Sequence, residues 1–131
     1  MLFLLSGLAS ACIAWCINYL LFQLLINKSK AVLAAPVVEE LSKTLIAINL
    51  GASILYTHLV FGLVEAVWDI RNSHKLGLTA AWMSVGGHAV FGLSAQIIYM
   101  NQQKILYSVA AGLIIHLIWN RMIYRLVINN N

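Results

Sequence analysis

Charged residues are scarce in this sequence. They make up 9% of the 131 residues, whereas hydrophobic residues make up 62%. Soluble domains carry about 25% charged residues, and a chain this short has too small a core to hide so much apolar surface from water. The scarcity of charge therefore argues against a soluble domain and favours an integral membrane protein.

Three further absences argue against a cleaved signal peptide, a disulfide and a nucleic-acid partner. No lysine or arginine precedes Lys28, so the charged region of a secretory signal is missing and we expect the first apolar run to be retained. The cysteines, Cys12 and Cys16, are four residues apart, which is poor spacing for a mutual disulfide on one helix. No basic patch is interleaved with aromatic residues, so no nucleic-acid partner is expected.

Five long apolar runs cover the chain. They span residues 2–26, 31–50, 52–70, 78–100 and 105–128. Each run is long enough to cross a bilayer as a helix, and backbone groups in lipid must be satisfied within the segment. The sequence therefore predicts an all-α fold, with one integral-membrane domain over residues 1–131 built as a polytopic bundle of about five transmembrane helices.

The basic residues orient this bundle. They gather between the first and second runs, between the third and fourth, and near the end of the fifth. Because such residues mark the cytoplasmic ends of membrane helices, we expect the N-terminus outside and the C-terminus in the cytoplasm. The basic residues placed inside are Lys28, Lys30, Arg71, Lys75, Arg121 and Arg125.

The acidic residues all lie within the second and third predicted helices. A charge at the bilayer centre costs about 2.5–3.5 kcal/mol, so intramembrane charges indicate a functional site by default. The four acidic residues are Glu39, Glu40, Glu65 and Asp69.

Three predicted helices carry a stripe that mixes small residues with strong polar groups. Residues three and four apart share a helix face, and small residues let helices approach closely in lipid, so we expect the three stripes to face one another. Despite its place on a stripe, His58 is expected at the outer membrane interface, near its helix end. The stripes are His58, Gly62, Glu65 and Asp69; Ser84, His88, Gly92 and Ala95; and Ser108, Gly112, His116 and Asn120.

The adjacent glutamates of the second helix cannot share one role, because neighbouring helical residues point about 100° apart. Lys43 is within helical reach of both and could neutralise one, which leaves the other beside a water as a general base. Pro36 leaves two alternatives: it kinks this helix, or it begins a helix whose dipole then favours the charge of Glu39 and Glu40.

The remaining polar groups complete a hydrolytic set. Glu65 could share the water of a catalytic glutamate, while histidines donate protons or stabilise an oxyanion. His116 and Asn120 are four residues apart on one face, and Asn120 supplies an amide donor. A base, a water site and an oxyanion hole together suit hydrolysis of a peptide bond inside a membrane.

Four motifs resemble one family. They read EELSK from Glu39, FGLVEAVWD from Phe61, GGHAVFG around His88, and HLIWN from His116. In this order they resemble the glutamic-type intramembrane proteases, specifically the PrsW-like branch of the CAAX protease/Abi superfamily. The resemblance runs from the first motif to Asn120, and this chain has fewer predicted helices than most PrsW-like proteins.

The resemblance implies a role for each motif residue. Glu39 would be the water-activating base, with Glu40 the partner of Lys43, and Glu65 and His88 would belong to the water site. His116 and Asn120 would stabilise the oxyanion, and Phe61 marks the second motif. The implied partner, besides the lipid bilayer, is a membrane-protein or membrane-proximal peptide substrate, and the implied location is a bacterial or archaeal plasma membrane.

Other interpretations stay open. No cofactor is favoured because the HExxH motif is absent, although a divalent metal such as zinc could be held by the two acids and two histidines. The protein could also be a small proton or ion carrier, since intramembrane acids and histidines form proton relays, or an inactive Abi-type immunity protein of the same fold. The alternative metal ligands are Glu39, Glu65, His88 and His116.

Overall fold

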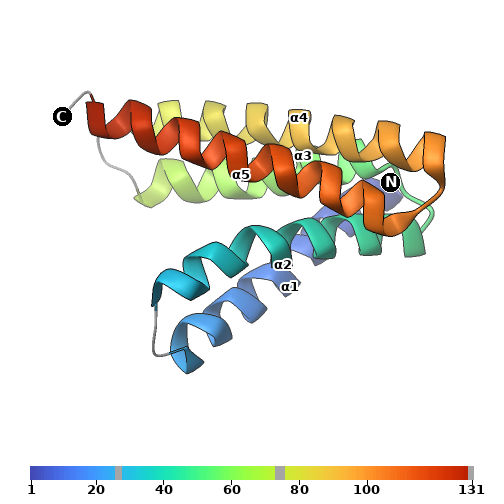
Figure 1. The fold of residues 1–131 in the computed structure, drawn as a ribbon, viewed down its shortest axis with the longest axis horizontal. Coiled ribbons are helices and arrows are strands. Elements are labelled where there is room, and N and C mark those ends of the chain that lie inside the picture. Colours follow the sequence, from blue (N-terminus) through green and yellow to red (C-terminus); the bar gives the residue numbers. More distant parts are fainter. Residues whose placement is uncertain (26–27, 73–75, 130–131) are drawn as a thin grey trace.

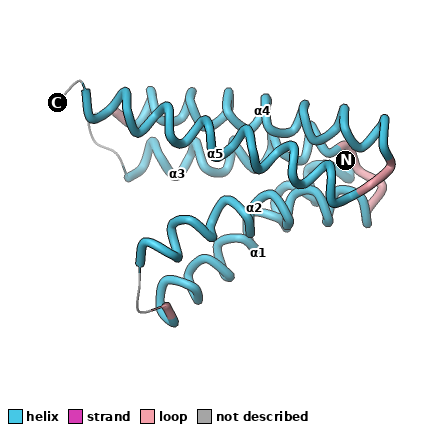
Figure 2. Tube along the Cα trace, viewed as in Figure 1, coloured by secondary structure: helices cyan, strands magenta, loops and turns pink. Residues whose placement is uncertain are grey.

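The computed structural model describes residues 1–25, 28–72 and 76–129. Within these ranges the chain forms five helices and no strand, as the sequence predicts, with only short loops between the helices (Figure 2). Every helix lies within a few residues of a predicted apolar run. The helices are α1 (Leu2–Leu24), α2 (Lys28–Asn49), α3 (Ile54–Asn72), α4 (Gly77–Gln102) and α5 (Ile105–Asn129).

The helices form two groups (Figure 1). Helices α3, α4 and α5 lie along one another, with α4 packed against both of the others, while α1 and α2 form a hairpin. The hairpin packs against α3 and α5 at the end of the molecule that holds the N-terminus and diverges from them toward the end that holds the C-terminus. Side chains from all five helices can therefore approach each other only along part of the bundle.

The connection between α2 and α3 is held by a glycine and by a glutamine of α4. Gly51 has a φ of +62°, a conformation that glycine adopts without steric cost. The side-chain oxygen of Gln96 then accepts hydrogen bonds from the backbone N–H groups of Ile54 at 2.9 Å and Leu55 at 3.2 Å. Because the first N–H groups of a helix have no partner within it, Gln96 fixes the start of α3 beside α4.

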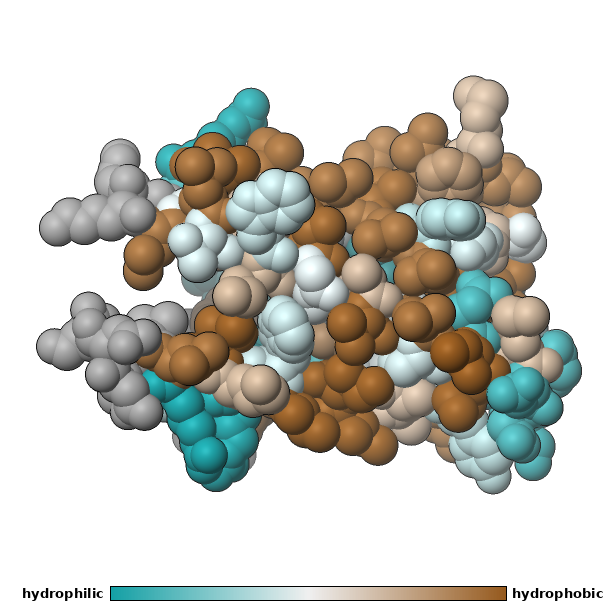
Figure 3. Space-filling view, turned by 90° about the horizontal axis from the view of Figure 1, so that it is seen from above, coloured by the Kyte–Doolittle hydropathy of each residue, from teal (hydrophilic) through white to brown (hydrophobic). Residues whose placement is uncertain are grey.

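Two of the described helices, α1 and the segment Ile105–Leu126 of α5, are long and apolar enough to cross a membrane. Only 28% and 22% of their most apolar windows are buried, whereas a core helix of a soluble protein is mostly buried. Hydrophobic residues cover much of the face shown in Figure 3, and hydrophilic residues gather toward its ends. An apolar surface this extensive indicates contact with a membrane or a partner.

Two sequence-based expectations about individual residues can be compared with these helices. Pro36 lies inside α2, well after its first residue, so the alternative in which it begins the helix is wrong and the helix dipole does not act on Glu39 and Glu40 from a first turn. Cys12 and Cys16 are free and exposed on α1, in agreement with the expectation that they do not bridge each other.

Candidate active site

The centre of the site is a buried ion pair on α2. Glu40 and Lys43 are both completely shielded from solvent, and the Lys43 ammonium donates a hydrogen bond to Glu40 Oε1 at 2.6 Å. The same ammonium lies 4.5 Å from the ring centroid of Phe61 on α3. A buried charge is tolerated only when it is paired, so this contact explains how one glutamate of the adjacent pair can sit in the core.

A chain of hydrogen bonds leads from Lys43 to α4 and α3. The Lys43 ammonium lies 3.1 Å from His88 Nδ1, and His88 Nε2 lies 2.5 Å from Glu65 Oε2. An ammonium can only donate, so Nδ1 is the acceptor and Nε2–H donates to Glu65. Ser84 Oγ donates a second hydrogen bond to the same carboxylate oxygen at 3.2 Å. The orientation and tautomer of His88 are thus set by both neighbours.

His116 of α5 connects the two adjacent glutamates. Its Nδ1 donates to Glu40 Oε1 at 2.9 Å, because an ionised carboxylate only accepts. Its Nε2 lies 4.0 Å from Glu39 Oε2, and its ring stacks on Phe91 with centroids 4.4 Å apart and planes inclined by 14°. The ring is therefore held from two sides, and its second nitrogen faces the glutamate that has no lysine partner.

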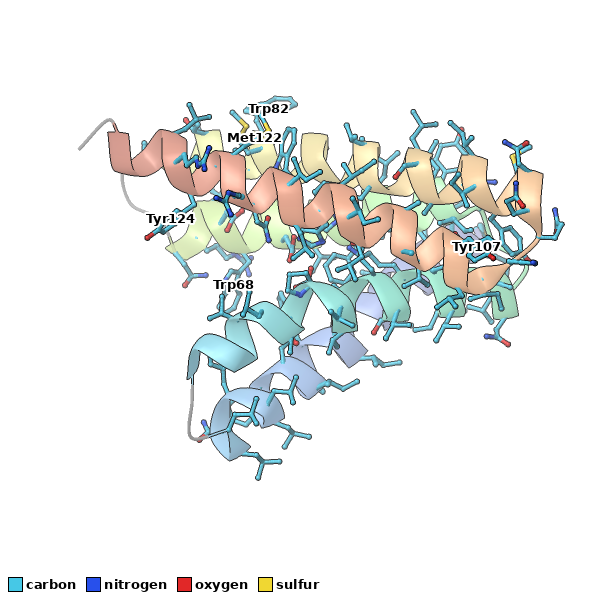
Figure 4. The ribbon with its side chains drawn as sticks, viewed as in Figure 1. Trp68, Trp82, Tyr107, Met122 and Tyr124 are labelled. Atoms are coloured by element: carbon cyan, nitrogen blue, oxygen red, sulfur yellow. The ribbon has the colours of Figure 1, made fainter. Side chains whose placement is uncertain are left out.

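Beside these groups lies a pocket of about 400 Å³ between α3, α4 and α5. Its polar lining comes from Glu65, Ser84, His88, His116 and Asn120, together with Asp69, and its apolar lining includes Phe91 and Trp119. Tyr124, another lining residue, is labelled in Figure 4 near the end of α5 that carries the C-terminus. The pocket thus offers space for a substrate segment directly against the polar groups.

Three glycines make room for the ionisable side chains. A Cβ atom added at any of them would lie 2.5–2.8 Å from a side-chain atom of another helix, closer than real contacts allow. The stripes of α3 and α4 therefore face each other, as expected, whereas the glycine of the α5 stripe faces Glu40 of α2. The pairs are Gly62 with His88, Gly92 with His58, and Gly112 with Glu40.

The structure shows a location for His58 that the expectation of an interfacial residue did not foresee. Its side chain faces the interior of the bundle and is completely buried, with Nδ1 3.8 Å from Glu40 Oε2. Its stripe position, seven residues before Glu65, was the signal for this location, because residues i and i+7 share a helix face. Reading only its distance from the helix end favoured the interface instead.

Within the described part of the chain, two groups could hold a metal ion. Their candidate ligand atoms lie within 4.8 Å of one another. The group with Glu39 and Glu65 has two carboxylates and an imidazole, a donor set that can balance a divalent cation. The group with Glu40 has one carboxylate, and Lys43 already pairs with it at 2.6 Å. The group with Glu39 and Glu65 is therefore the better metal site. The groups are Glu39, Glu65 and His88, and Glu40, His58 and His88.

Comparison of the chain with known protein families, with curated proteins and with solved structures gives no match. The class of this protein is therefore described by its fold and its buried polar cluster. It is an all-helical protein with a buried Glu–Lys–His cluster beside a pocket. The resemblance to PrsW-like proteases stays a prediction.

Proposed function

We propose that this protein is an integral-membrane endopeptidase of the glutamic, PrsW-like type, which hydrolyses a peptide bond in or near the membrane with a glutamate-activated water. The observation that carries the proposal is that two carboxylates and two imidazoles, contributed by four helices, meet beside a pocket of about 400 Å³. These groups are Glu39 of α2, Glu65 of α3, His88 of α4 and His116 of α5.

In this proposal all five helices cross the bilayer. The apolar composition of α1 and α5 supports it, and so do the burial of Glu40 and Lys43 of α2 and the partial burial of Glu65 of α3. Arg71 near the end of α3, and Arg121 and Arg125 near the end of α5, lie toward one end of the bundle. That end is cytoplasmic in the proposed topology. Lys75 and the side chains of Lys28 and Lys30 lie outside the described residues.

Glu39 is the proposed general base. It has no lysine within salt-bridge distance in the described structure, and its carboxylate faces His116 Nε2 at 4.0 Å. As the water oxygen bonds to the scissile carbonyl carbon, Glu39 accepts the water proton. The carbonyl π electrons move to oxygen. Asn120 lines the pocket, and its amide is the proposed donor to that oxyanion.

His116 is the proposed proton carrier to the leaving group. Glu39 passes the proton to His116 Nε2, and the resulting imidazolium is stabilised by Glu40 through Nδ1–H at 2.9 Å. The imidazolium then protonates the leaving nitrogen as the carbon–nitrogen bond breaks, which returns His116 to its neutral form. Glu40 thus serves His116 as the acidic member serves histidine in a catalytic triad.

The proposal requires no metal. The residues that would hold a divalent cation such as zinc are Glu39, Glu65 and His88, and a bound cation would supply water activation. Incubation with a chelator distinguishes the two chemistries. We expect full proteolytic activity after dialysis against a strong chelator, and loss of activity that zinc restores would replace the glutamate base by a metal-bound water.

The second candidate is a proton carrier. The observation in its favour is the hydrogen-bonded series from Lys43 through His88 to Glu65, because such series conduct protons in membrane proteins. Proton flux into liposomes without proteolysis would favour the carrier. An inactive immunity protein is disfavoured because all four motifs are present.

The decisive experiment is proteolysis of a single-span reporter by the purified chain in lipid nanodiscs. We expect Glu39→Gln to lower the cleavage rate by about 10²–10⁴-fold, the usual contribution of a general base. Gln102→Ala, at the exposed end of α4, is the matched control and should cleave at the rate of the unmodified chain. Full cleavage by Glu39→Gln would remove glutamate-dependent proteolysis from consideration.

A further inference from the structure

His58 takes no part in the reaction proposed above, yet its location is specific. Its side chain is completely buried on α3 and packs against the backbone of α4 at Gly92, where a Cβ atom would lie 2.6 Å from His58 Cβ. Its ring centroid lies 6.5 Å from that of His88. The close approach at Gly92 keeps the imidazole inside the bundle and next to Glu40.

Three polar atoms without hydrogen-bond partners meet at this point. They are both ring nitrogens of His58 and Oε2 of Glu40, each buried and unpaired among the described residues. His58 Nδ1 and Glu40 Oε2 are 3.8 Å apart, slightly beyond a direct hydrogen bond, and a small side-chain rotation or one bridging water would connect them. Unpaired buried polar atoms are rare in folded proteins. A hydrogen bond between His58 Nδ1 and Glu40 Oε2 would give both of these atoms a partner.

A metal ion is a poorer explanation for the same atoms. Glu40, His58 and His88 have the spacing of a ligand set, but the Lys43 ammonium already contacts Glu40 at 2.6 Å and His88 at 3.1 Å. A divalent ion beside that ammonium would place three positive charges against one carboxylate in a buried site, which is strongly unfavourable.

We propose that His58 is a positioning residue that holds the free oxygen of Glu40 through its Nδ1–H. Lys43 and His116 both donate to Oε1, so the carboxylate is secured on one side only, and His58 secures the other. The carboxylate plane then cannot rotate, and the direction in which Glu40 presents His116 to the pocket is fixed. The effect on catalysis rests on the proposed function, whereas the contact itself does not.

The contact is tested by the tautomer of His58, measured by nitrogen NMR on the full chain with ¹⁵N-labelled histidine in nanodiscs. The His58 signals are assigned as those missing from the spectrum of His58→Asn. We expect Nδ1 to be protonated and Nε2 to be unprotonated. A neutral ring with its proton on Nε2 would overturn the proposal, and this result does not depend on whether the chain is a protease.

The positioning role is tested by reporter cleavage with two His58 variants. His58→Leu removes the donor, and we expect kcat to fall about tenfold or more with KM within about twofold, because misorientation of a catalytic group slows the reaction step. His58→Asn retains an N–H near the position of Nδ1 and should recover most of kcat. Thr57→Val, equally buried on the same turn but bonded to Ser6, is the control and should cleave normally.

The outcomes separate the two proposals. Equal kcat values for His58→Leu and the unmodified chain would overturn the positioning role, as would a loss that His58→Asn does not reduce. If His58→Leu does not fold, His58→Asn is compared with His58→Gln instead. The amide of His58→Gln reaches the position of Nε2 rather than that of Nδ1. Equal kcat values for these two variants would overturn the positioning role. Absence of cleavage by the unmodified chain, with Nδ1 of His58 protonated, would reject the protease and keep the contact.

Discussion

The site contains two groups of similar residues in different surroundings. The inner cluster consists of Glu40, Lys43 and His58, all completely buried. The outer cluster consists of Glu39, Glu65, His88 and His116. The last three line the pocket, and the Glu65 side chain is 29% exposed. Both clusters combine carboxylates with imidazoles, but only the inner one contains its own cation.

Because of this difference, we assign a structural role to the inner cluster and a catalytic role to the outer cluster. In the inner cluster the carboxylate charge is balanced by Lys43 at 2.6 Å, so the cluster contributes a fixed, neutral centre on which His116 and His88 are oriented. Of the outer carboxylates, Glu65 lines the pocket, and Glu39 lies 4.0 Å from His116, which also lines it. We therefore expect changes in the inner cluster to reduce stability first and changes in the outer cluster to reduce activity first.

The largest effect on stability is expected from Lys43→Met. The substitution leaves the Glu40 charge buried without a partner, and breaking such a pair by removing one member costs about 3–5 kcal/mol. The measurement is the free energy of unfolding in detergent, with the exposed Lys104→Met as the control. The double variant Lys43→Met with Glu40→Leu should recover part of the loss, and a cost below about 1 kcal/mol for Lys43→Met would show that the inner cluster is not a closed pair.

An intermediate effect is expected from Gly112→Ala. The added Cβ would lie 2.5 Å from Glu40 Oε2, so the carboxylate or α5 must move, at a cost of about 1–3 kcal/mol for overpacking. Because α5 also carries His116, we expect cleavage to fall together with the melting temperature. Gly86→Ala meets no atom within 4 Å and provides the control, whose stability should be unchanged or slightly higher. Equal stability of the two variants would contradict the close approach.

The smallest effect is expected from Ser84→Ala in the outer cluster. It removes the hydroxyl that lies 3.2 Å from Glu65 Oε2 and 3.4 Å from the Gly62 carbonyl oxygen but leaves the shorter contact between His88 and Glu65. We expect a stability loss of about 0.5–1.5 kcal/mol and a fall in kcat of less than tenfold, read from reporter cleavage and thermal unfolding. A stability loss as large as that of Lys43→Met would contradict the expectation that changes in the outer cluster reduce activity before stability.

Much of the fold follows from simple features of the sequence, and the arrangement of the site follows less directly. The apolar runs predicted five helices because their lengths and short connections leave few alternatives. Gly62 and Gly92 predicted the approach of α3 and α4, but the approach of Gly112 to Glu40 of α2 was not predicted. The divergence of α1 and α2 from the other helices could not be predicted, because small residues indicate that helices approach but not at what angle or over what length.

The individual roles of the ionisable residues were harder to infer. Sequence spacing showed that Glu39 and Glu40 differ in direction but not which one pairs with Lys43. The family resemblance implied Glu40, and Glu40 is the residue that pairs with Lys43 in the core. The burial of His58 was missed because distance from a helix end was taken as depth in the membrane, although its partner helix carries a glycine at the matching position. Helical stripes were the better guide, since they record neighbours as well as depth.

The three glycine pairings mean that the polar cluster depends on two sets of positions in the sequence, the polar residues themselves and the glycines that face them. His88, His58 and Glu40 each face a glycine of a different helix, so the room for each of these side chains is set by a second position in the sequence. In a related sequence with a smaller residue in place of His58 or His88, the opposing glycine can be replaced by a larger residue. Where the imidazole ring is kept, the glycine must be kept as well. Paired change at these positions would therefore trace the cluster through sequences in which no single motif survives.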